Sequence, residues 1–299
     1  MKQVEERYIS LLTDFGFKRI FGTAMNKDLL ICFLNSLFNG RQVVKDVMYL
    51  NPEHVGDVYT DRRAIFDVYC EGENGEKFIV EMQNAYQAYF KDRSLFYSTF
   101  PIREQAPKGN DWDFKLNHIY TIALLNFNMN EDAFDKEKIR HHVQLCDTAT
   151  HKIFYDKLEF IYVEIAKFNT PLEELDTLYE KWLYALKNLY KLTQRPKELC
   201  DKVFDRLFEE AEIAKFTPQE MREYEASKKA YRDIKNSIDT AKQEGLAQGM
   251  ELGLAQGMEK GKNQKALEIA RKMQAKGIDE DAIMEMTGLS QDEIRQLKS

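Results

Sequence analysis

Residues 61–84, DRRAIFDVYCEGENGEKFIVEMQN, constrain this chain more than any other stretch. Two runs rich in β-branched and aromatic residues, 63–71 and 76–83, flank the turn sequence, which predicts a β-hairpin with a glycine in its turn. Each run carries an acidic residue in its middle, Asp67 in the first and Glu81 in the second. An ionised carboxylate inside an apolar strand is costly unless another group compensates its charge. What this chain can do therefore depends on how the two runs pair.

Two registers are open to this hairpin. If Asn-Gly at 74–75 forms a two-residue type I′ turn, Asp67 lies opposite Met82, and the two carboxylates point to opposite faces of the sheet. If Glu-Asn-Gly at 73–75 forms a three-residue loop whose glycine adopts the left-handed conformation of a G1 bulge, Asp67 lies opposite Glu81. We predict the second register, because only it puts both carboxylates on one face.

Paired carboxylates on one face predict a divalent-cation site. Two adjacent negative charges repel each other, and a bound cation relieves that repulsion. Hard oxygen ligands with room for water suit magnesium, with manganese as the alternative, and such an ion lowers the pKa of a bound water for attack on phosphorus. Gln83 lies two residues past Glu81 on the same face, where its amide can orient that water. The alternative is a solvent-exposed amphipathic hairpin whose acidic residues only face water.

Asp67, followed by Glu81-Met82-Gln83 as E-x-Q, is one of several motifs that follow one another along residues 8–190. TDFGFKRIFG at 13–22 precedes it, and it is followed by RSLFYST at 93–99, FKLNHIYTIALLNF at 114–127, KLEFIYVEIAKF at 157–168 and the pair Trp182-Leu183. This ordered set resembles the PD-(D/E)xK nuclease family transposases, the group that includes the recombination-promoting nucleases. The resemblance implies an α/β fold: a restriction-endonuclease-like core, with a central mixed sheet flanked by helices, and a helical C-terminal region.

The resemblance also implies a function. It implies a bacterial, metal-dependent DNA endonuclease that hydrolyses phosphodiester bonds in DNA recombination or transposition, with Asp67 and Glu81 holding Mg²⁺ and Gln83 positioning the water. Glutamine at this position replaces the lysine that gives the superfamily its name, and glutamine carries no positive charge. Lys18 can supply that charge from elsewhere in the chain. The rival interpretation is a catalytically decayed nuclease fold that acts as a nucleic-acid- or protein-binding module.

A helix over residues 14–21 places Asp14 and Lys18 on one face with Phe17 and Phe21. The family resemblance makes Asp14 a candidate accessory acid. The alternative is that Asp14 is an ordinary acidic residue at a helix N-terminus, followed by two core phenylalanines. Lys18 would then be only a solvent-exposed residue beside them.

Arg93 and Gln105 are candidate nucleic-acid contacts. Arg93 falls in a helix that we predict from Tyr86 to about Phe100, with Pro101 limiting its extent. A guanidinium can clamp a phosphate with two hydrogen bonds, although Arg93 can instead pair with a nearby acid. Gln105 stands where the resembling family has a further polar residue.

The remaining periodicities predict a sheet flanked by helices. We expect a helix over 27–38 ended by Asn-Gly, strands over 43–50, 115–126, 139–147 and 157–167, and helices over 172–192, 196–214 and 218–242. His141 and His142 are neighbours on a predicted strand and so point to opposite faces, which makes them a poor metal pair and favours structural roles.

The C-terminal segment begins with a glycine at every fourth position from 245 to 261. This repeat favours either a flexible tether or a glycine-striped helix for dimerisation. A basic helix over 264–276 precedes AIMEMTGLSQDEIRQL at 282–297, which is similar to a helix-turn-helix. Acidic residues at 292–293 would repel phosphates, which argues against base reading and favours a small helical hairpin for partner contact.

We therefore expect four segments. They are a nuclease core at 1–170, a helical extension at 171–242, the glycine repeat at 243–262 as a linker or oligomerisation helix, and a small helix-turn-helix-like tail at 263–299. The expected partner is DNA, with a homo-oligomer through the C-terminal helices as a further expectation.

Composition and charge limit the environment of the protein. The formal net charge is −7 and no apolar run is long enough to span a membrane, so we expect no membrane partner and only a local basic track for DNA. The four cysteines are far apart without a C-x-x-C pair, and the first ten residues are charged rather than apolar. Both features favour the cytoplasm.

Overall fold

The computed structural model describes residues 6–54, 64–106, 113–129 and 133–297. The chain divides into two compact units, Met1–Lys235 and Asn236–Ser299, and each is described by itself.

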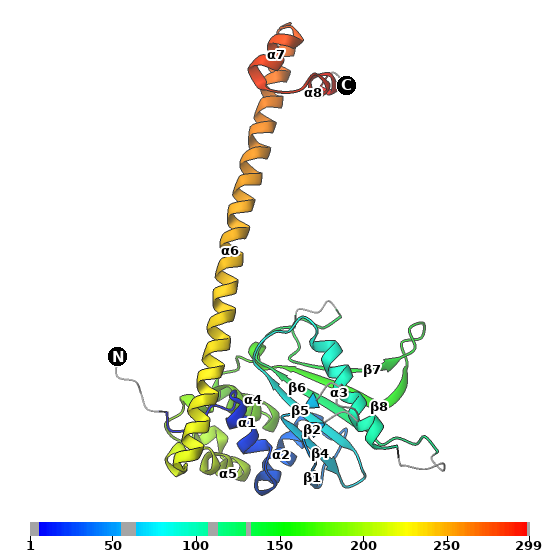
Figure 1. Cartoon of the computed structure of the whole chain (residues 1–299), viewed down its shortest axis with the longest axis vertical. Coiled ribbons are helices and arrows are strands. Elements are labelled where there is room, and N and C mark those ends of the chain that lie inside the picture. The colour runs from blue at the N-terminus through cyan, green and yellow to red at the C-terminus, as the bar shows by residue number, and fades with distance from the viewer. Residues whose placement is uncertain (1–5, 55–63, 107–112, 130–132, 298–299) are drawn as a thin grey trace. The chain divides into compact units, whose positions relative to one another are not determined.

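A six-stranded sheet forms the centre of the first unit (Figure 1). In order across the sheet, its strands are β1 (Val47–Tyr49), β4 (Val68–Gly72), β5 (Lys77–Gln83), β6 (Ile119–Leu125), β8 (Ile153–Glu164) and β7 (Arg140–Cys146). Strand β6 runs parallel to both β5 and β8, whereas the other pairs are antiparallel. The sheet is therefore mixed, as expected. A separate two-stranded ribbon pairs β2 (Glu53–His54) with β3 (Ala64–Ile65).

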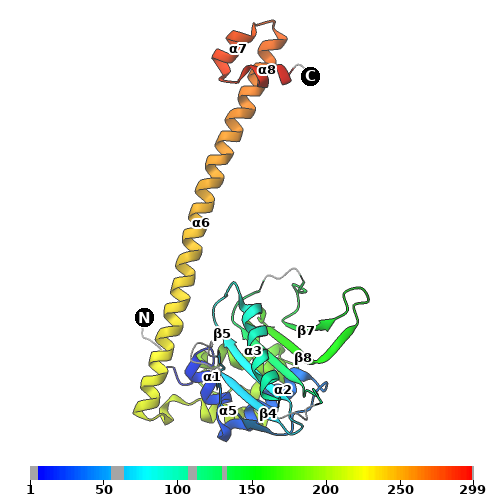
Figure 2. The same ribbon diagram turned by 45° about the vertical axis from the view of Figure 1, so that its right-hand side comes forward.

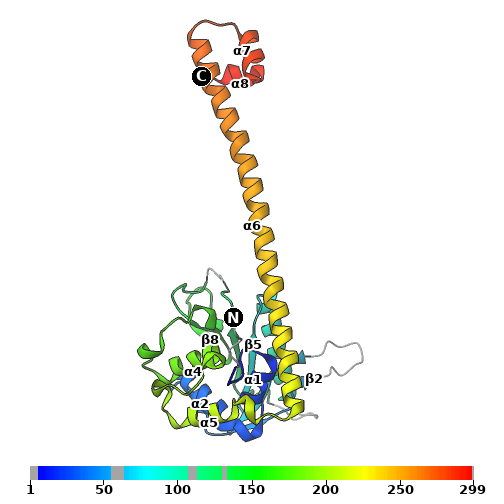
Figure 3. The same ribbon diagram turned by 90° about the vertical axis from the view of Figure 1, so that its left-hand side faces the viewer.

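Helices cover both faces of this sheet, which confirms the expected architecture (Figures 2 and 3). One face carries α3 (Phe90–Glu104), and the other carries α1 (Asp14–Phe21), α2 (Lys27–Phe38), α4 (Leu178–Asn188) and α5 (Lys202–Glu210). Short 3₁₀ helices lie between these elements: η1 (Ala24–Asn26), η2 (Ile165–Lys167), η3 (Leu172–Glu174), η4 (Leu189–Lys191), η5 (Lys197–Leu199) and η6 (Ile213–Lys215). The bounds of α1 and α2 agree with the predicted ranges.

The alternation of side chains along β5 decides which face carries the acidic residue. Phe78, Val80 and Met82 belong to the larger core under α1 and α2, whereas Ile79 belongs to the cluster beneath α3. Because the side-chain period of a strand is two, Glu81 lies on the α3 face with Ile79.

The hairpin adopts the predicted register. Val68 pairs with Val80 and Glu71 with Lys77, which aligns Asp67 with Glu81. The three-residue loop 73–75 follows, and its last residue, Gly75, has φ +81°, as a G1 bulge requires.

The first run of the hairpin is not one continuous strand, which corrects the predicted range 63–71. It is divided into β3 and β4, and Arg63 lies outside the described residues. The backbone N–H of Phe66 donates to the carbonyl of Pro52, and that of Asp67 donates to the Glu81 side chain. The Glu81 side chain therefore accepts the N–H of Asp67 in place of a backbone carbonyl. The backbone hydrogen bonds between the strands are interrupted beside the acidic pair.

Three predicted helix ends are also wrong. Helix α3 begins at Phe90 rather than Tyr86 and continues past Pro101 to Glu104. A proline removes one helical hydrogen bond, but burial of Phe100 and Pro101 holds the last turn in place. Helix α6 (Pro218–Ala275) begins at the predicted proline but extends far beyond residue 242. The glycine repeat is part of this helix and does not interrupt it.

The second unit contains the rest of α6, α7 (Glu280–Thr287) and α8 (Gln291–Gln296). It has a small core of its own, formed by Ala270, Met273, Ile283, Leu289 and Ile294. Gly288 ends α7 in the left-handed conformation, and Ser290 begins α8 with a capping box to Glu293. The sequence TGLS is thus the predicted turn between two helices. Within the described chain, a Cβ added at any of the five repeat glycines would meet open space.

The bulged turn predicts a specific response to substitution at Gly75. Alanine there must adopt a left-handed backbone conformation, which costs about 1–2 kcal/mol for a residue with a Cβ, and in either variant the Cβ must displace the Asn117 side chain. Asparagine tolerates that conformation better, so Gly75→Asn should lower the free energy of unfolding less than Gly75→Ala. Urea denaturation of both variants measures the difference, and Gly75→Ala as stable as the unsubstituted chain would contradict the turn.

Candidate functional site

Asp67 and Glu81 lie side by side at the interruption between β3 and β4. The backbone N–H of Asp67 donates to Glu81 Oε1 at 3.2 Å, and the backbone N–H of Met82 donates to Asp67 Oδ2 at 2.8 Å. Glu81 is only 5% exposed, and 19% of the Asp67 side chain is accessible. The hairpin register therefore holds two carboxyl groups together in a recess.

Gln83 contacts this pair as the sequence predicts. It lies at the end of β5, and its Nε2 donates to Glu81 Oε2 at 3.0 Å. Because Gln83 and Glu81 are two residues apart on one strand, both side chains project from the same face.

Lys18 reaches the pair from α1. Its Nζ lies 2.7 Å from Asp14 Oδ1 and 3.7 Å from Asp67 Oδ1. Burial lowers the pKa of Lys18, but the hydrogen bond and charge of Asp14, together with the two carboxylates of the pair, outweigh burial and raise it. Lys18 therefore carries a positive charge at neutral pH. Asp14 holds Lys18 by their ion pair, and its own negative charge raises the pKa of Asp67.

A glycine fixes the position of α1. A Cβ at Gly16 would overlap the carbonyl oxygen of Ser10, so only glycine allows this close approach. Thr13 caps the helix by accepting the backbone N–H of Gly16 at 3.1 Å. The segment before α1 therefore holds Asp14 and Lys18 at the edge of the site.

The two carboxyl groups perturb each other. Burial, followed by the charge of Asp67, raises the pKa of Glu81 from an ordinary value of 4.5 to about 8. Burial likewise raises the pKa of Asp67, and the Met82 N–H and the charge of Lys18 partly oppose this shift. Desolvated like charges of this kind are typical of functional sites.

Arg93 lies beside the pair on α3. Its Nη1 donates to Gln87 Oε1 at 2.6 Å, and its guanidinium lies over the rings of Phe90 and Tyr97 at 5.2 and 5.6 Å. Its positive charge lowers the pKa of both carboxyl groups. Nε and Nη2 of Arg93 are buried and have no hydrogen-bond partner among the described residues, so these two donors are unsatisfied in the folded chain.

Tyr97 lies on α3 near the acidic pair. Its ring packs against Phe66 at 5.1 Å. Burial, followed by the charge of Glu81, raises the pKa of Tyr97. Tyr97 therefore packs in the cluster beneath α3 and also lies close enough to the acidic pair to be affected by its charge.

Gln105 is not brought to the site. It follows Arg93 by twelve residues, about 18 Å at the rise of an α-helix. Its Oε1 accepts the backbone N–H of Asn117 at 2.6 Å, and its Nε2 donates to the carbonyl of Pro101 at 3.1 Å. A nucleic-acid contact by Gln105 stays a prediction.

The adjacent histidines are separated as predicted. His141 Nε2 lies 3.0 Å from Glu164 Oε2, whereas His142 Nδ1 lies 2.9 Å from Glu159 Oε1. Over the part of the chain that the structure describes, no three His, Cys, Asp or Glu side chains converge to hold a metal. The Asp67–Glu81 pair thus offers two protein ligands, a donor set that fits Mg²⁺ because this ion keeps several waters.

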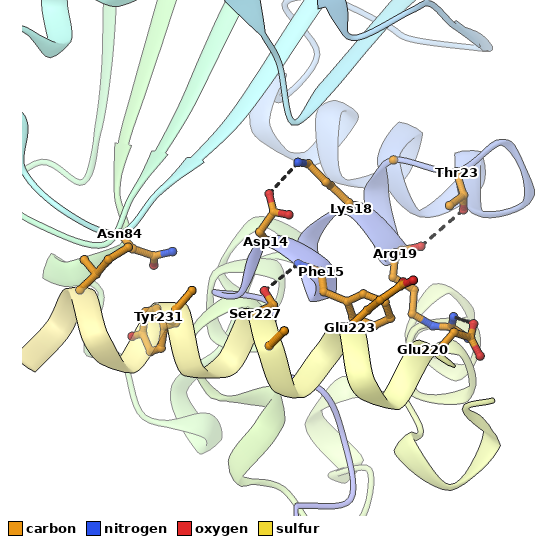
Figure 4. Close-up of a pocket in the computed structure, with 14 residues that line it drawn as sticks. Asp14, Phe15, Lys18, Arg19, Thr23, Asn84, Glu220, Glu223, Ser227 and Tyr231 are labelled. Carbon is orange, nitrogen blue, oxygen red and sulfur yellow. Dashed lines mark hydrogen bonds and ion pairs between the residues drawn. The ribbon is translucent and has the colours of Figure 1, made fainter. Parts of the chain in front are cut away.

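A pocket of about 810 Å³ adjoins the site between α1 and the first turns of α6 (Figure 4). Asp14 and Lys18 belong to its wall as well as to the site. Its other polar lining residues are Arg19, Thr23, Asn84, Glu220, Glu223, Ser227 and Tyr231. Sequence reasoning did not identify the α6 residues, because nothing in the local pattern of a helix shows that it packs beside α1, some 200 positions earlier in the chain.

A mixed sheet with an acidic pair at the end of its hairpin is the arrangement of a nuclease core, and comparison with known families agrees. Residues 11–241 match the model of the PD-(D/E)XK nuclease family transposases, so the chain belongs to this family and has its restriction-endonuclease-like fold. Residues 263–299 match the C-terminal HTH domain of the Rpn/YhgA-like nuclease family. No curated protein and no solved structure matches the chain.

These matches define the class of the protein. The chain is a member of a nuclease family linked to transposition, and both matched regions imply DNA binding. Nucleases of this class typically use divalent metal ions. Among the described helices, none has the length and apolar character needed to cross a membrane.

The raised pKa of Glu81 predicts a pH-dependent stability in metal-free buffer. Between pH 4.5 and about 8, the folded chain retains a proton on Glu81 that the unfolded chain releases. The free energy of unfolding should therefore fall as pH rises through this range, by at most about 1.4 kcal/mol per pH unit. Glu81→Gln should remove the part of this pH dependence that comes from Glu81.

Urea unfolding in EDTA at a series of pH values compares the two proteins. The same pH slope with and without the Glu81 carboxyl would show that Glu81 ionises normally in the folded state.

Proposed function

We propose that this protein is a metal-dependent DNA endonuclease that hydrolyses phosphodiester bonds during DNA recombination or transposition. The observation that carries the proposal is the buried Asp67–Glu81 pair, whose mutual repulsion a divalent cation would relieve. We infer that Mg²⁺ is the ion, with Mn²⁺ as the alternative, because two carboxylates and several waters suit both. When bound, the ion would lower the pKa of a coordinated water and neutralise charge on the phosphate.

In the proposed mechanism, each remaining side chain has a separate task. Gln83, which touches Glu81, would orient the attacking water through its amide. Lys18 would supply the positive charge that glutamine at position 83 lacks, because its Nζ is held within 4 Å of Asp67 and its raised pKa keeps it protonated. Asp14 would position Lys18 through their 2.7 Å ion pair.

Arg93 would bind the phosphate from the α3 side. Its aromatic neighbours and Gln87 hold the guanidinium in place, and its remaining donors match phosphate oxygens. The negative charge that develops on the phosphate during attack would therefore lie between Lys18 and Arg93. Fixed cations at that position would stabilise the transition state.

Plasmid nicking tests this function. The protein should nick supercoiled DNA in Mg²⁺ and not in EDTA, and Asp67→Asn should abolish nicking. Asp46→Asn is the matched control, because Asp46 is exposed and pairs with Lys27, so it should cut like the wild type. Metal-independent binding of DNA without any nicking by the wild type would instead favour the decayed nuclease fold as a binding module.

The assignment of Lys18 has its own test. Lys18→Gln should slow nicking by about 10²-fold, the usual effect of removing one preorganised donor from a transition state. Adding Gln83→Lys to this variant should restore part of the rate, since residue 83 already contacts Glu81. Lys27→Gln, which removes a lysine paired with Asp46, should change little. A Lys18→Gln rate within about twofold of the wild type would remove Lys18 from the mechanism.

For the rest of the chain, we propose the division into a core at 1–170, a helical extension at 171–242, the glycine repeat at 243–262 and a tail at 263–299. The tail would add DNA affinity, and the repeat would join copies of the chain. A cytoplasmic location also belongs to the proposal.

Removal of the tail tests this division. A chain that ends near Lys242 should keep metal-dependent nicking per active site and lose DNA affinity or self-association, because both proposed metal ligands precede residue 90 and Arg93 also precedes the tail. Loss of nicking at saturating DNA, with the fold intact, would show that the tail completes the active site.

A further inference from the structure

The pocket between α1 and α6 begins where the proposed metal site ends. Lys18 lines both, with its Nζ 3.7 Å from Asp67 Oδ1. Asn84, directly after β5, closes the side nearest the sheet, and its Nδ2 donates to the carbonyl of Leu12 at 2.6 Å. If the proposed function is right and a phosphate lies at the acidic pair, the neighbouring nucleotide of that strand reaches the mouth of this pocket.

One wall of the pocket is a row of hydrogen-bonding side chains on α6. Glu223, Ser227 and Tyr231 are spaced at i, i+4 and i+8 and therefore lie along one face of the helix (Figure 4). Ser227 Oγ accepts the backbone N–H of Phe15 at 3.0 Å, and Tyr231 Oη accepts from Asn126 Nδ2 at 3.2 Å. Each hydroxyl thus serves as an acceptor for the protein and keeps its O–H group to donate, while Glu223 offers an acceptor.

The α1 side of the pocket adds an aromatic ring. The half-buried ring of Phe15 contacts Phe216 and Tyr224, at centroid distances of 5.7 and 6.0 Å. On α6, Ala226, Ala230 and Ile234 add small or aliphatic surface beside the polar groups. A flat aromatic face beside donors and acceptors is what an unstacked nucleobase requires, since it stacks on its face and forms hydrogen bonds at its edge.

The charges of the pocket favour a base over a phosphate. Arg19, one of its two cations, is already paired with Glu220 and lies over the Phe216 ring at 4.3 Å. Glu223 adds a negative charge to the α6 wall of the pocket, which is separate from the Asp67–Glu81 pair. A phosphate would be repelled there, whereas a neutral ring would not.

We propose that this pocket receives one unstacked nucleobase of the strand being cut, so that the nuclease prefers DNA that is unpaired beside the scissile phosphate. This inference rests on the proposed nuclease function. It defines a substrate class: duplexes with bubbles, gaps or frayed ends, in which extruding a base requires little energy.

Binding in EDTA tests the pocket separately from cleavage. Fluorescence anisotropy compares a labelled, fully paired duplex with the same duplex carrying a short unpaired internal segment. The wild type should bind the second DNA about tenfold more tightly, the scale of one base–aromatic stack. Ala230→Trp fills the pocket without removing a contact and should bring this ratio close to one while duplex affinity is kept.

Two further variants complete the experiment. Ala241→Trp places the same side chain on an exposed position of α6 outside the pocket and should keep the tenfold ratio. Tyr231→Phe, which removes only a hydroxyl, should lower it. Equal affinity of the wild type for both DNAs, or an unchanged ratio in Ala230→Trp and Tyr231→Phe, overturns the pocket proposal. These outcomes are independent of plasmid nicking, whose absence would instead overturn the proposed function.

Discussion

The repulsion between two buried carboxyl groups is the interaction on which the rest of this site depends. Placing the Asp67 and Glu81 carboxyl groups together inside a recess is unfavourable, as the raised pKa of both groups shows. The fold sustains it because backbone N–H groups solvate the pair from one side and Lys18 and Arg93 supply opposite charge from two different helices. Such an arrangement weakens the apo protein and favours the binding of a cation.

The role proposed for Lys18 follows from the same geometry. Position 83 carries a glutamine on the strand of Glu81, whereas Lys18 brings a positive charge from α1 to Asp67. Helix α1 is in turn fixed by α6, because Tyr224 Oη accepts the backbone N–H of Ser10 and Ser227 Oγ accepts that of Phe15. The first turns of α6 therefore belong to the same compact unit as the acidic pair, which is consistent with the family match continuing to residue 241.

Local signals in the sequence were sufficient for much of the fold. Helices α1 and α2 could be bounded because apolar periodicity and end signals agree, and Gly75 identified the register that aligns the acidic pair. The strand break at Asp67 could not be seen, because it arises when a side chain replaces a backbone partner. Pro101 gave a false helix end for a similar reason, since tertiary burial outweighed the lost hydrogen bond.

Two contacts between distant segments could not be predicted from the sequence. The pocket wall on α6 and the approach of Arg93 to the acidic pair depend on packing, for which no local pattern exists. The glycine repeat is a case in which local composition was misleading. Glycine at every fourth position weakens a helix, yet the whole repeat lies within α6.

Thermal unfolding in increasing Mg²⁺ or Mn²⁺ tests whether Asp67 and Glu81 form a metal site. An ion that binds only the folded chain raises the melting temperature by mass action. The melting temperature of the wild type should rise with the ion concentration, and that of Glu81→Gln should not. A melting temperature that millimolar Mg²⁺ and Mn²⁺ leave unchanged in the wild type, or raise equally in both proteins, would contradict the metal site.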